Sequence, residues 1–206
     1  IGMSDAFERE ILKVPPREGR DSDDPDDAGG LTSRGITEAT ARAAFEQGIV
    51  STPDPRKLSF EGVKAIYRVF YWDRIHGDDL PEGVAGLVFD ESVNCGVGTA
   101  IKNLQSALNI ILKKQLVVDG SFGPKTEAAL SAVLALEANV VDLFPEISPL
   151  FFRKALIRAL VEGRAGYYVS ITDEETPREV KNRKFFRGWM NRLKAWMSRF
   201  DVKNRL

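Results

Sequence analysis

The stretch REGRDSDDPDDAGGLTSRGIT, residues 17–37, gathers acidic side chains and four glycines in one polar segment. It follows a short segment in which Phe7 and Ile11 fall on one face of a helix that Pro15 and Pro16 would end. Glycines placed just before a helix start are typical of a backbone that turns tightly and lets a ligand approach. The stretch therefore predicts a loop that joins a first helix to the rest of the chain.

This acidic loop fits some functions better than others. A calcium loop of the EF-hand type needs oxygen ligands at alternate positions, but the fifth position counted from Asp21 is Pro25 and the twelfth is Thr32. A flexible linker needs neither the proline stop nor the paired glycines. A looser cation site and a structured loop with solvated acids stay open, beside a catalytic loop that works through a carboxyl group.

The catalytic interpretation rests on Glu18. Cleavage of a glycosidic bond needs one protonated carboxyl group and commonly a second carboxylate that activates water or stabilises the oxocarbenium ion. A free Glu has a pKa of about 4.3, so the acid must be partly desolvated or lie near other negative charge to stay protonated. Glu18 stands beside apolar Val14 and the prolines and precedes the acids of residues 21–27, which favours both conditions.

Composition restricts the remaining chemistry. The chain has 206 residues, 43% hydrophobic and 29% charged, which is typical of a globular protein. Cys95 is the only thiol, so no intrachain disulfide can form, and His76, predicted at a helix end, is the only imidazole. One Cys and one His make a poor zinc set, and a Ser or Cys nucleophile would need His76 as its base. We therefore expect carboxylate chemistry, with no metal and no cofactor.

Helical periodicity dominates the rest of the chain, and no alternating strand pattern exceeds four residues. The fold class predicted is mainly α, with a small turn or hairpin element at residues 117–123 and a loose connector at 171–182. No apolar run of about 18 residues occurs, so no membrane-spanning helix is expected. The predicted helices after the loop cover residues 37–48, 59–75, 81–95, 98–114, 124–137, 148–168 and 183–200.

Charge is distributed unevenly although the net charge is only −1. Residues 178–206 carry ten basic side chains and two acidic ones, and Trp196 and Phe200 recur among them at helical spacing. This pattern predicts a basic amphipathic C-terminal helix that draws the protein toward an anionic envelope or membrane surface. No nucleic-acid-binding motif accompanies it, so no nucleic acid partner is expected.

Short motifs follow one another in a specific order. The first are Glu18-Gly19, Asp24-Pro25, Asp27-Ala28-Gly29-Gly30-Leu31-Thr32, Gly35-Ile36, Tyr71-Trp72, Phe89-Asp90 and Val93-Asn94-Cys95-Gly96. In this order they resemble glycoside hydrolase family 108, the N-acetylmuramidases found as phage endolysins and related lysis proteins. Arg20 and Asp21 depart from the Gly-Tyr pair usual in that family.

A second group of motifs resembles the peptidoglycan-binding segment that accompanies this family. It consists of Leu104-Gln105, Asp119-Gly120-Ser121-Phe122-Gly123-Pro124-Lys125-Thr126 and Phe185-Phe186-Arg187-Gly188-Trp189-Met190-Asn191-Arg192. The resemblance implies a lysozyme-like catalytic region at residues 1–90, a peptidoglycan-binding-like helical region at 91–177 and the basic helix at 178–206. We expect these regions to pack as one compact unit in a monomer.

The resemblance also implies roles for individual residues. Glu18 corresponds to the family's catalytic acid, and Asp27 and Thr32 to a pair that positions or activates water, with Asp23, Asp24 and Asp26 competing for the role of Asp27. Gly30, Tyr71, Trp72 and Asn94 are predicted to contact substrate. For Tyr71 and Trp72 a place in the core is at least as common, and Asn94 is as well suited to capping a helix.

The resulting prediction is a lysozyme of phage or prophage origin that hydrolyses the β-1,4 bond between N-acetylmuramic acid and N-acetylglucosamine, with antimicrobial action. Synthesis in a host cytoplasm without a signal peptide and later release to the cell wall in the periplasm are expected. Two alternatives stay open: a lytic transglycosylase, which needs a single acid, and a non-catalytic wall-binding or secretion-helper protein.

Overall fold

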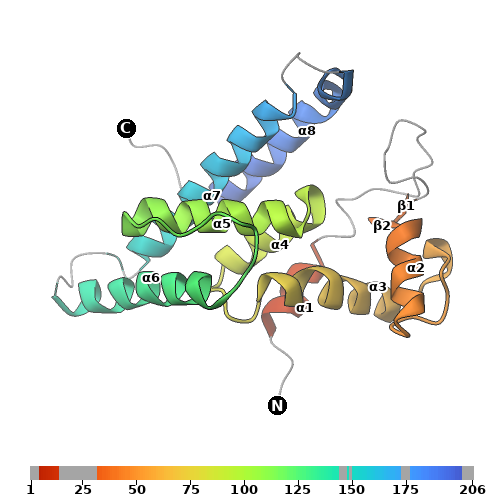
Figure 1. The fold of residues 1–206 in the computed structure, drawn as a ribbon, viewed down its shortest axis with the longest axis horizontal. Coiled ribbons are helices and arrows are strands. Elements are labelled where there is room, and N and C mark those ends of the chain that lie inside the picture. The colour runs from red at the N-terminus through yellow and green to blue at the C-terminus, as the bar shows by residue number, and fades with distance from the viewer. Residues whose placement is uncertain (1–4, 14–31, 144–147, 149, 173–176, 201–206) are drawn as a thin grey trace. The chain divides into compact units, whose positions relative to one another are not determined.

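Helices make up nearly all of the regular structure in this computed structural model, which describes residues 5–13, 32–143, 148, 150–172 and 177–200 (Figure 1). The chain divides into two units, Ile1–Asp79 and Leu80–Leu206. Within the described residues, no helix is both long and apolar enough to cross a membrane. The predicted mainly α, lysozyme-like fold class is confirmed.

The first unit consists of short helices and one two-stranded hairpin. Its buried apolar side chains come from α1, β2, α2, α3 and the turns around α3, among them Phe7, Ile36, Ile66 and Trp72. Its elements are α1 (Asp5–Ile11), β1 (Thr32–Ser33), β2 (Ile36–Thr37), α2 (Glu38–Glu46), the 3-10 turn η1 (Pro55–Lys57), α3 (Phe60–Tyr67), the π-helical turn η2 (Arg68–Trp72) and the 3-10 turn η3 (Asp73–Ile75).

Side-chain caps set two of these helix starts. The Thr37 hydroxyl accepts a hydrogen bond from the backbone N–H of Thr40 at 3.2 Å, and the Ser59 hydroxyl accepts one from Gly62 at 3.0 Å. Each satisfies a backbone donor that a helix start otherwise leaves unpaired. The helix predicted over residues 59–75 instead changes to π and then 3-10 geometry, and His76, at a φ of +53°, ends it as predicted.

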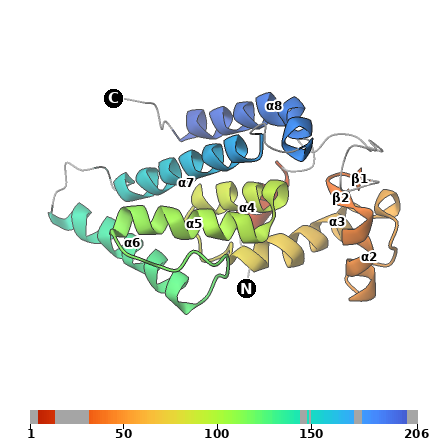
Figure 2. The ribbon, with the colours of Figure 1, turned by 45° about the horizontal axis from the view of Figure 1, so that its top comes forward.

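The second unit is a bundle of longer helices. Helix α5 packs against α4, α6 and α7, and α7 runs beside α8, as Figure 2 shows. Its core side chains include Val88, Leu104, Leu108 and Leu160. The elements are α4 (Val84–Cys95), α5 (Val97–Leu112), α6 (Pro124–Leu143), α7 (Phe151–Ser170) and α8 (Pro177–Arg199).

Several predicted boundaries were wrong in this unit. Helix α4 begins at Val84 rather than at residue 81, because Gly83 has a φ of +85° and a Cβ there would lie 2.7 Å from the ring of Phe200. Helix α8 begins at Pro177, so the second half of the predicted connector is helical. Residues 117–123 form no strand; the hairpin lies at residues 32–37 instead.

The domain boundary predicted after residue 90 falls inside α4. The contacts place the division between Asp79 and Leu80, so all of α4 packs with α5 and α7. Helix α8, predicted as a separate region, packs against α7 in the same unit. The packing of the regions into one compact unit stays a prediction.

Candidate active site

The predicted catalytic residues Glu18 and Asp27, and the predicted substrate contact Gly30, lie outside the described residues. Both flanks of their segment are described and belong to the first unit. On one flank Ile11 is fully buried at the end of α1, and Lys13 pairs with the buried carboxylate of Glu10 at 2.6 Å. On the other flank the chain enters β1, so the segment joins two ordered elements.

The hairpin that follows this segment is tight. Its strands are antiparallel, with Thr32 opposite Thr37 and Ser33 opposite Ile36. Arg34 and Gly35 connect them with φ values of +50° and +77°. Positive φ at both central residues defines a type I′ turn, whose twist matches that of the strands. The backbone of Thr32, the third predicted catalytic residue, is therefore fixed in register with β2.

Two side chains hold the turn. The hydroxyl group of Tyr67, on α3, donates a hydrogen bond to the backbone carbonyl of Arg34 at 3.0 Å, and Tyr67 is fully buried. The guanidinium of Arg34 donates to the carbonyl of Leu58, just after η1. A left-handed conformation costs a residue other than glycine about 1 kcal/mol, and these two bonds offset it. These two hydrogen bonds connect the hairpin to α3 and to Leu58, which precedes α3.

Trp72 corrects a prediction. Its side chain is 0% exposed, its Nε1 donates to Asp78 Oδ1 at 2.8 Å, and its ring meets the edge of Phe7 at 5.4 Å between centroids. A Cβ at Gly77 would overlap the Trp72 ring. A ring enclosed in this way has no face left for a sugar, so Trp72 is a core residue rather than a substrate contact.

Tyr71 points differently from its neighbour. Its ring is half-buried and lies 5.5 Å from that of Tyr67, the residue that holds the hairpin turn. Adjacent residues of a helical turn point in different directions, so Tyr71 does not share the enclosure of Trp72. Tyr71 therefore stays a candidate for substrate contact.

In the second unit, the motif residues of α4 belong to a buried network of charged groups. Arg164, on α7, is fully buried and donates to Asp90 Oδ2 at 2.7 Å, while Arg192, on α8, lies 3.5 Å from Asp90 Oδ1. One carboxylate thus connects three helices. Burial of a charge is tolerated only where partners of opposite sign compensate it.

Asn94 takes part in the same network. Its Oδ1 accepts hydrogen bonds from the Tyr168 hydroxyl at 2.7 Å and from Arg164 Nη2 at 3.4 Å. These bonds fix the orientation of the amide, and its nitrogen donates to no other residue that the structure describes. Asn94 is half-buried and has a structural role in this network, and its contact with substrate stays a prediction.

Two regions of the chain match known protein families. Residues 11–96 match the family described as Glycosyl hydrolase 108, and residues 99–194 match the family described as Predicted Peptidoglycan domain. The chain therefore carries a glycosyl hydrolase 108 region followed by a peptidoglycan domain. The resemblance drawn from the short motifs is confirmed, and so is the prediction of a glycoside hydrolase.

A solved structure supports the same assignment over nearly the whole length. The family 108 chain is similar to the structure described as "Structure of Brucella abortus SagA", with 27% sequence identity and a TM-score of 0.67. The similarity covers 97% of this chain and 96% of that one. None of the curated proteins compared with the chain matches it. The similarity to this solved structure therefore includes both the glycosyl hydrolase 108 region and the peptidoglycan domain.

The family also settles the class of polymer. A family 108 hydrolase followed by a peptidoglycan domain acts on peptidoglycan, so the predicted glycosidase class and peptidoglycan partner are confirmed at that level. The first match ends at Gly96, after α4, although α4 packs in the second unit. The family 108 region therefore spans the division between the units.

In the peptidoglycan domain of this family 108 chain, the Asp-Gly motif has a structural role. The Gln105 amide donates from Nε2 to Asp119 Oδ1 at 2.8 Å and to the carbonyl of Ser121 at 3.1 Å, and its Oε1 accepts from the N–H of Gly120 at 2.9 Å. These hydrogen bonds hold the pKa of Asp119 below its ordinary value. Gln105 Nε2 also donates to the Thr126 hydroxyl at 3.1 Å, and these hydrogen bonds of Gln105 together form the Gln105 clamp. The motif therefore fixes the loop between α5 and α6.

Glu91 and Arg164 were missed by the sequence analysis. Glu91 is fully buried and accepts a hydrogen bond from Asn103 at 2.8 Å, and burial raises its pKa to about 7. Burial likewise raises the pKa of the Cys95 thiol to about 11, so it stays protonated near neutral pH. A signal existed: Arg164 stands four residues after Leu160 on the apolar stripe of α7.

The chain was predicted to use carboxylates, and the candidate metal ligands in its described part lie apart from one another. Among those residues, no three His, Cys, Asp or Glu side chains come together as a metal ion would require. His76 lies at the surface, with its Nδ1 3.4 Å from Asp79 Oδ2.

Proposed function

We propose that this family 108 hydrolase is a muramidase that cleaves the β-1,4 bond between N-acetylmuramic acid and N-acetylglucosamine, with Glu18 as its general acid. The observation that carries the proposal is the family match over residues 11–96, which contains Glu18 and the hairpin. The tied hairpin supports it, since a catalytic loop needs a fixed framework at its ends.

In the proposed reaction, the Glu18 carboxyl group donates its proton to the oxygen that links the two sugars. The bond from the sugar carbon to that oxygen breaks, and positive charge develops on the ring as an oxocarbenium ion. Asp27 positions or activates the water that completes hydrolysis, and Thr32 assists. The acids between Glu18 and Asp27 supply negative charge close to the donor in sequence, and such charge favours a protonated carboxyl group.

The test is Glu18→Gln, assayed by release of reducing ends from purified peptidoglycan. General acid catalysis contributes about 100-fold or more to such reactions, so turnover should fall by at least that factor. Glu46→Gln, an exposed position at the end of α2, is the matched control and should keep full turnover. Helicity and thermal unfolding of both variants show whether they fold alike.

Two outcomes would contradict the proposal. Turnover retained by a folded Glu18→Gln variant would remove Glu18 from the mechanism. Products that end in anhydro-muramic acid, identified by mass spectrometry, would assign the enzyme to the lytic transglycosylases instead. Products with a reducing muramic acid end are the expected result.

The role of Asp27 has its own experiment, because three other aspartates stand close to it in sequence. Each is changed to Asn in turn, and only Asp27→Asn should lower turnover by more than about tenfold. A larger loss in one of the other three variants would transfer the role. The residues compared with Asp27 are Asp23, Asp24 and Asp26.

We propose further that the enzyme acts as an endolysin drawn to the anionic envelope by α8. The helix docks with its apolar side inward: Trp196 is 3% exposed and stacks on Phe200 at 5.7 Å, and Trp189 stacks on Tyr168 at 4.9 Å. Because Trp196 is buried, we expect the predicted attraction to an anionic envelope to act through the basic side chains. The exposed basic residues are Arg183, Lys184, Arg187, Lys194 and Arg199.

This second role is tested by replacing Arg183, Lys184 and Arg187 with Gln. Because exposed charges act through screened long-range attraction, the variant should lyse whole cells more slowly at low salt and equally at high salt. Digestion of purified wall by the same variant at high salt should stay within about twofold of that by the parent chain. Equal lysis of whole cells at low salt would contradict the role.

A further inference from the structure

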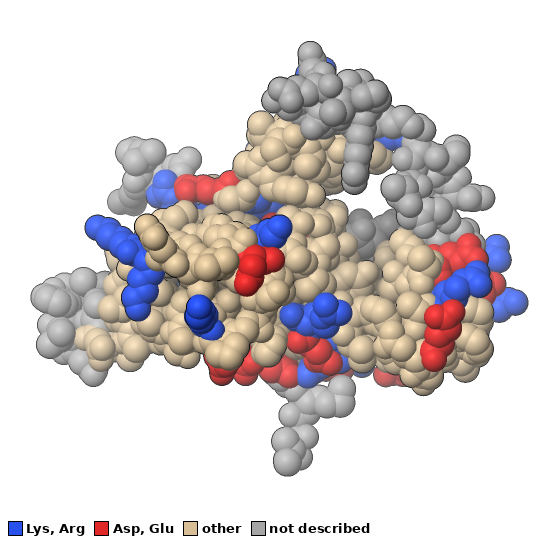
Figure 3. Space-filling view, in the orientation of Figure 1, with Lys and Arg blue, Asp and Glu red and all other residues tan. Residues whose placement is uncertain are grey.

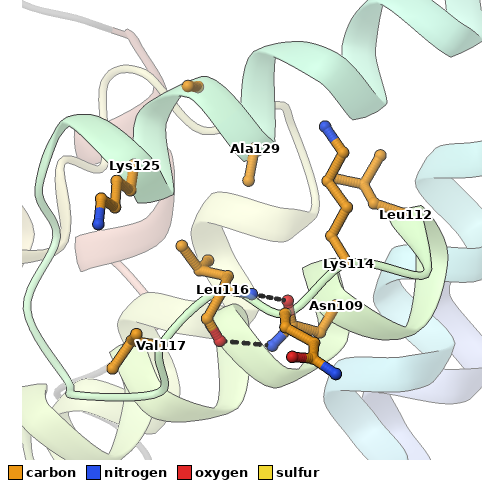
Figure 4. A pocket seen from close by; sticks show the side chains of 9 residues that line it. Asn109, Leu112, Lys114, Leu116, Val117, Lys125 and Ala129 are labelled. Atoms are coloured by element: carbon orange, nitrogen blue, oxygen red, sulfur yellow. Dashed lines mark hydrogen bonds between the residues drawn. The ribbon is translucent and has the colours of Figure 1, made fainter.

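A cavity of about 400 Å³ opens in the peptidoglycan domain, between the end of α5, the residues after it and the start of α6 (Figure 4). The side chains that matter for its chemistry are those of Asn109, Leu112, Lys114, Leu116, Val117 and Lys125. It lies wholly within the second unit. Nothing in the catalytic proposal uses it.

The cavity is cationic. Lys114 and Lys125 line it from opposite sides, from the end of α5 and from the first turn of α6 (Figure 4). No acidic residue is among the described residues that line it, and neither lysine forms an ion pair with an acid in the described part of the chain. Figure 3 shows basic side chains gathered where the end of α5 lies beside α6. The charge is therefore directed at a ligand or at solvent.

The wall between the two lysines is rigid. Asn109 donates from Nδ2 to the carbonyl of Leu116 at 2.8 Å and accepts from the N–H of Leu116 at 2.6 Å, which pins the chain that follows α5. The Gln105 clamp holds the next turn, around Gly120. Because the backbone is already ordered, a ligand loses little affinity to the ordering of this wall.

Apart from Asn109 and Gln115, the remaining lining is aliphatic. Leu112, Leu116 and Val117 face the cavity, and Val117 is 64% exposed. None of the nine residues that line it is aromatic, so no ring offers a platform on which a sugar face could stack. Two cations separated by methyl groups suit a ligand that carries carboxylates and small apolar side chains.

We propose that this cavity binds the acidic stem peptide of peptidoglycan, with Lys114 and Lys125 pairing with its carboxylates and the aliphatic wall receiving its alanine methyl groups. The inference rests on the proposed function only in its choice of peptidoglycan as the polymer. A phosphate-rich wall polymer would satisfy the lysines, but it has no side chains for the aliphatic wall. The cavity therefore recognises the peptide, and the catalytic region the glycan.

The test measures, by fluorescence anisotropy, binding of the full chain to the synthetic peptide L-Ala-γ-D-Glu-L-Lys-D-Ala. A neutral fluorophore blocks its N-terminus, so that its two carboxylates outnumber its one amine. Solvent-exposed lysine–carboxylate pairs are individually weak, so Lys114→Gln with Lys125→Gln should weaken binding by about three- to tenfold. Lys102→Gln with Lys113→Gln removes the same charge from exposed positions outside the cavity and should leave binding unchanged. The peptide with its carboxylates converted to amides should bind the parent chain as weakly as the acidic peptide binds the cavity variant.

Three results would overturn the inference: no binding of the acidic peptide at millimolar concentration, equal weakening by both double variants, or stronger binding of poly(glycerol phosphate) than of the peptide. The proposed muramidase activity is measured separately, on glycan chains stripped of their peptides. Loss of peptide binding with unchanged cleavage of stripped glycan in the cavity variant is the expected pattern. Failure of the parent chain to cleave stripped glycan would count against the muramidase alone.

Discussion

Different kinds of polar interaction stabilise the interior of each unit. Around the hairpin and the start of α3 in the first unit, side chains bind the backbone: Tyr67 holds the turn carbonyl of Arg34, and Ser59 caps a helix. In the second unit, charged side chains bind one another across helices, as Arg164 does with Asp90. The first arrangement fixes the path of the chain, whereas the second fixes the relative positions of helices.

This difference matches what each unit has to do. A hairpin that adjoins the proposed catalytic segment would have to hold its backbone to within a fraction of an ångström, and backbone-directed bonds restrain it in that way. A bundle that presents binding surfaces needs its helices fixed in position relative to one another. A buried ionic contact between residues 74 positions apart favours one relative position of α4 and α7, because any other leaves a charge unpaired. The variants below test this contrast.

The largest effect is expected for Arg164→Met. The change leaves the Asp90 carboxylate buried without its closest partner, and removal of one member of a buried ion pair costs about 3–5 kcal/mol. Urea unfolding should report a loss of this size. Arg158→Met, on the same helix, removes an exposed pair with Glu162 and should cost less than about 0.5 kcal/mol. Similar losses in both would contradict the contrast.

Glu91→Gln should change how stability depends on pH. The folded-state pKa of about 7 lies above the ordinary value of 4.5, so the folded protein holds the proton more tightly and loses stability as pH rises from about 4.5 to about 7. The loss approaches about 3 kcal/mol above that range.

The Gln variant lacks this titration. Its free energy of unfolding should match that of the parent near pH 4 and exceed it near pH 8, where the parent carries a buried carboxylate beside Asn103 and Asp90. Unfolding curves collected at both pH values decide the point. A constant difference between the two proteins would show that Glu91 does not titrate in this range.

Trp72→Phe tests the reassignment of an aromatic residue from substrate to core. Loss of the hydrogen bond to Asp78 and of ring volume should lower the free energy of unfolding by about 2 kcal/mol. The KM for peptidoglycan should not change. Phe45→Leu, at an exposed position on α2, should leave both quantities unchanged. A raised KM at full stability would restore the substrate role.

The smallest stability effect is expected for Tyr67→Phe, which removes the hydrogen bond to the hairpin turn at a cost of about 1 kcal/mol. Ser59→Ala should cost a similar amount by removing a helix cap. Only the tyrosine variant should also lower kcat, because only it loosens the strand that carries Thr32. Equal kcat values in the two variants would separate the turn from catalysis.

Local signals predicted the helices of this chain well. The helices predicted from residues 37 and 59 start beside the caps Thr37 and Ser59, and His76 was predicted at a helix end, because such signals depend on neighbours within four residues. The order of short motifs identified the family over most of the length. These features share one property: the information lies close together along the chain.

Features that depend on distant partners were missed. The start of α4 depends on Gly83, whose conformation leaves space for Phe200 more than a hundred positions away. The roles of Glu91 and Arg164 depend on helices that meet only in the fold. Trp72 was assigned to substrate because a motif cannot show which face of a residue is enclosed.

Helix α4 has a consequence for how such enzymes can be recombined. It ends the sequence region shared with other family 108 members, yet its residues from Val84 to Ser92 are buried in the bundle of the following region. A gene fusion that joins residues 1–96 to a different wall-binding module would include α4 but not α5 and α7, the helices that bury its apolar side chains. Exchange of modules should therefore succeed at the junction near Leu80, with α4 inherited by the downstream piece.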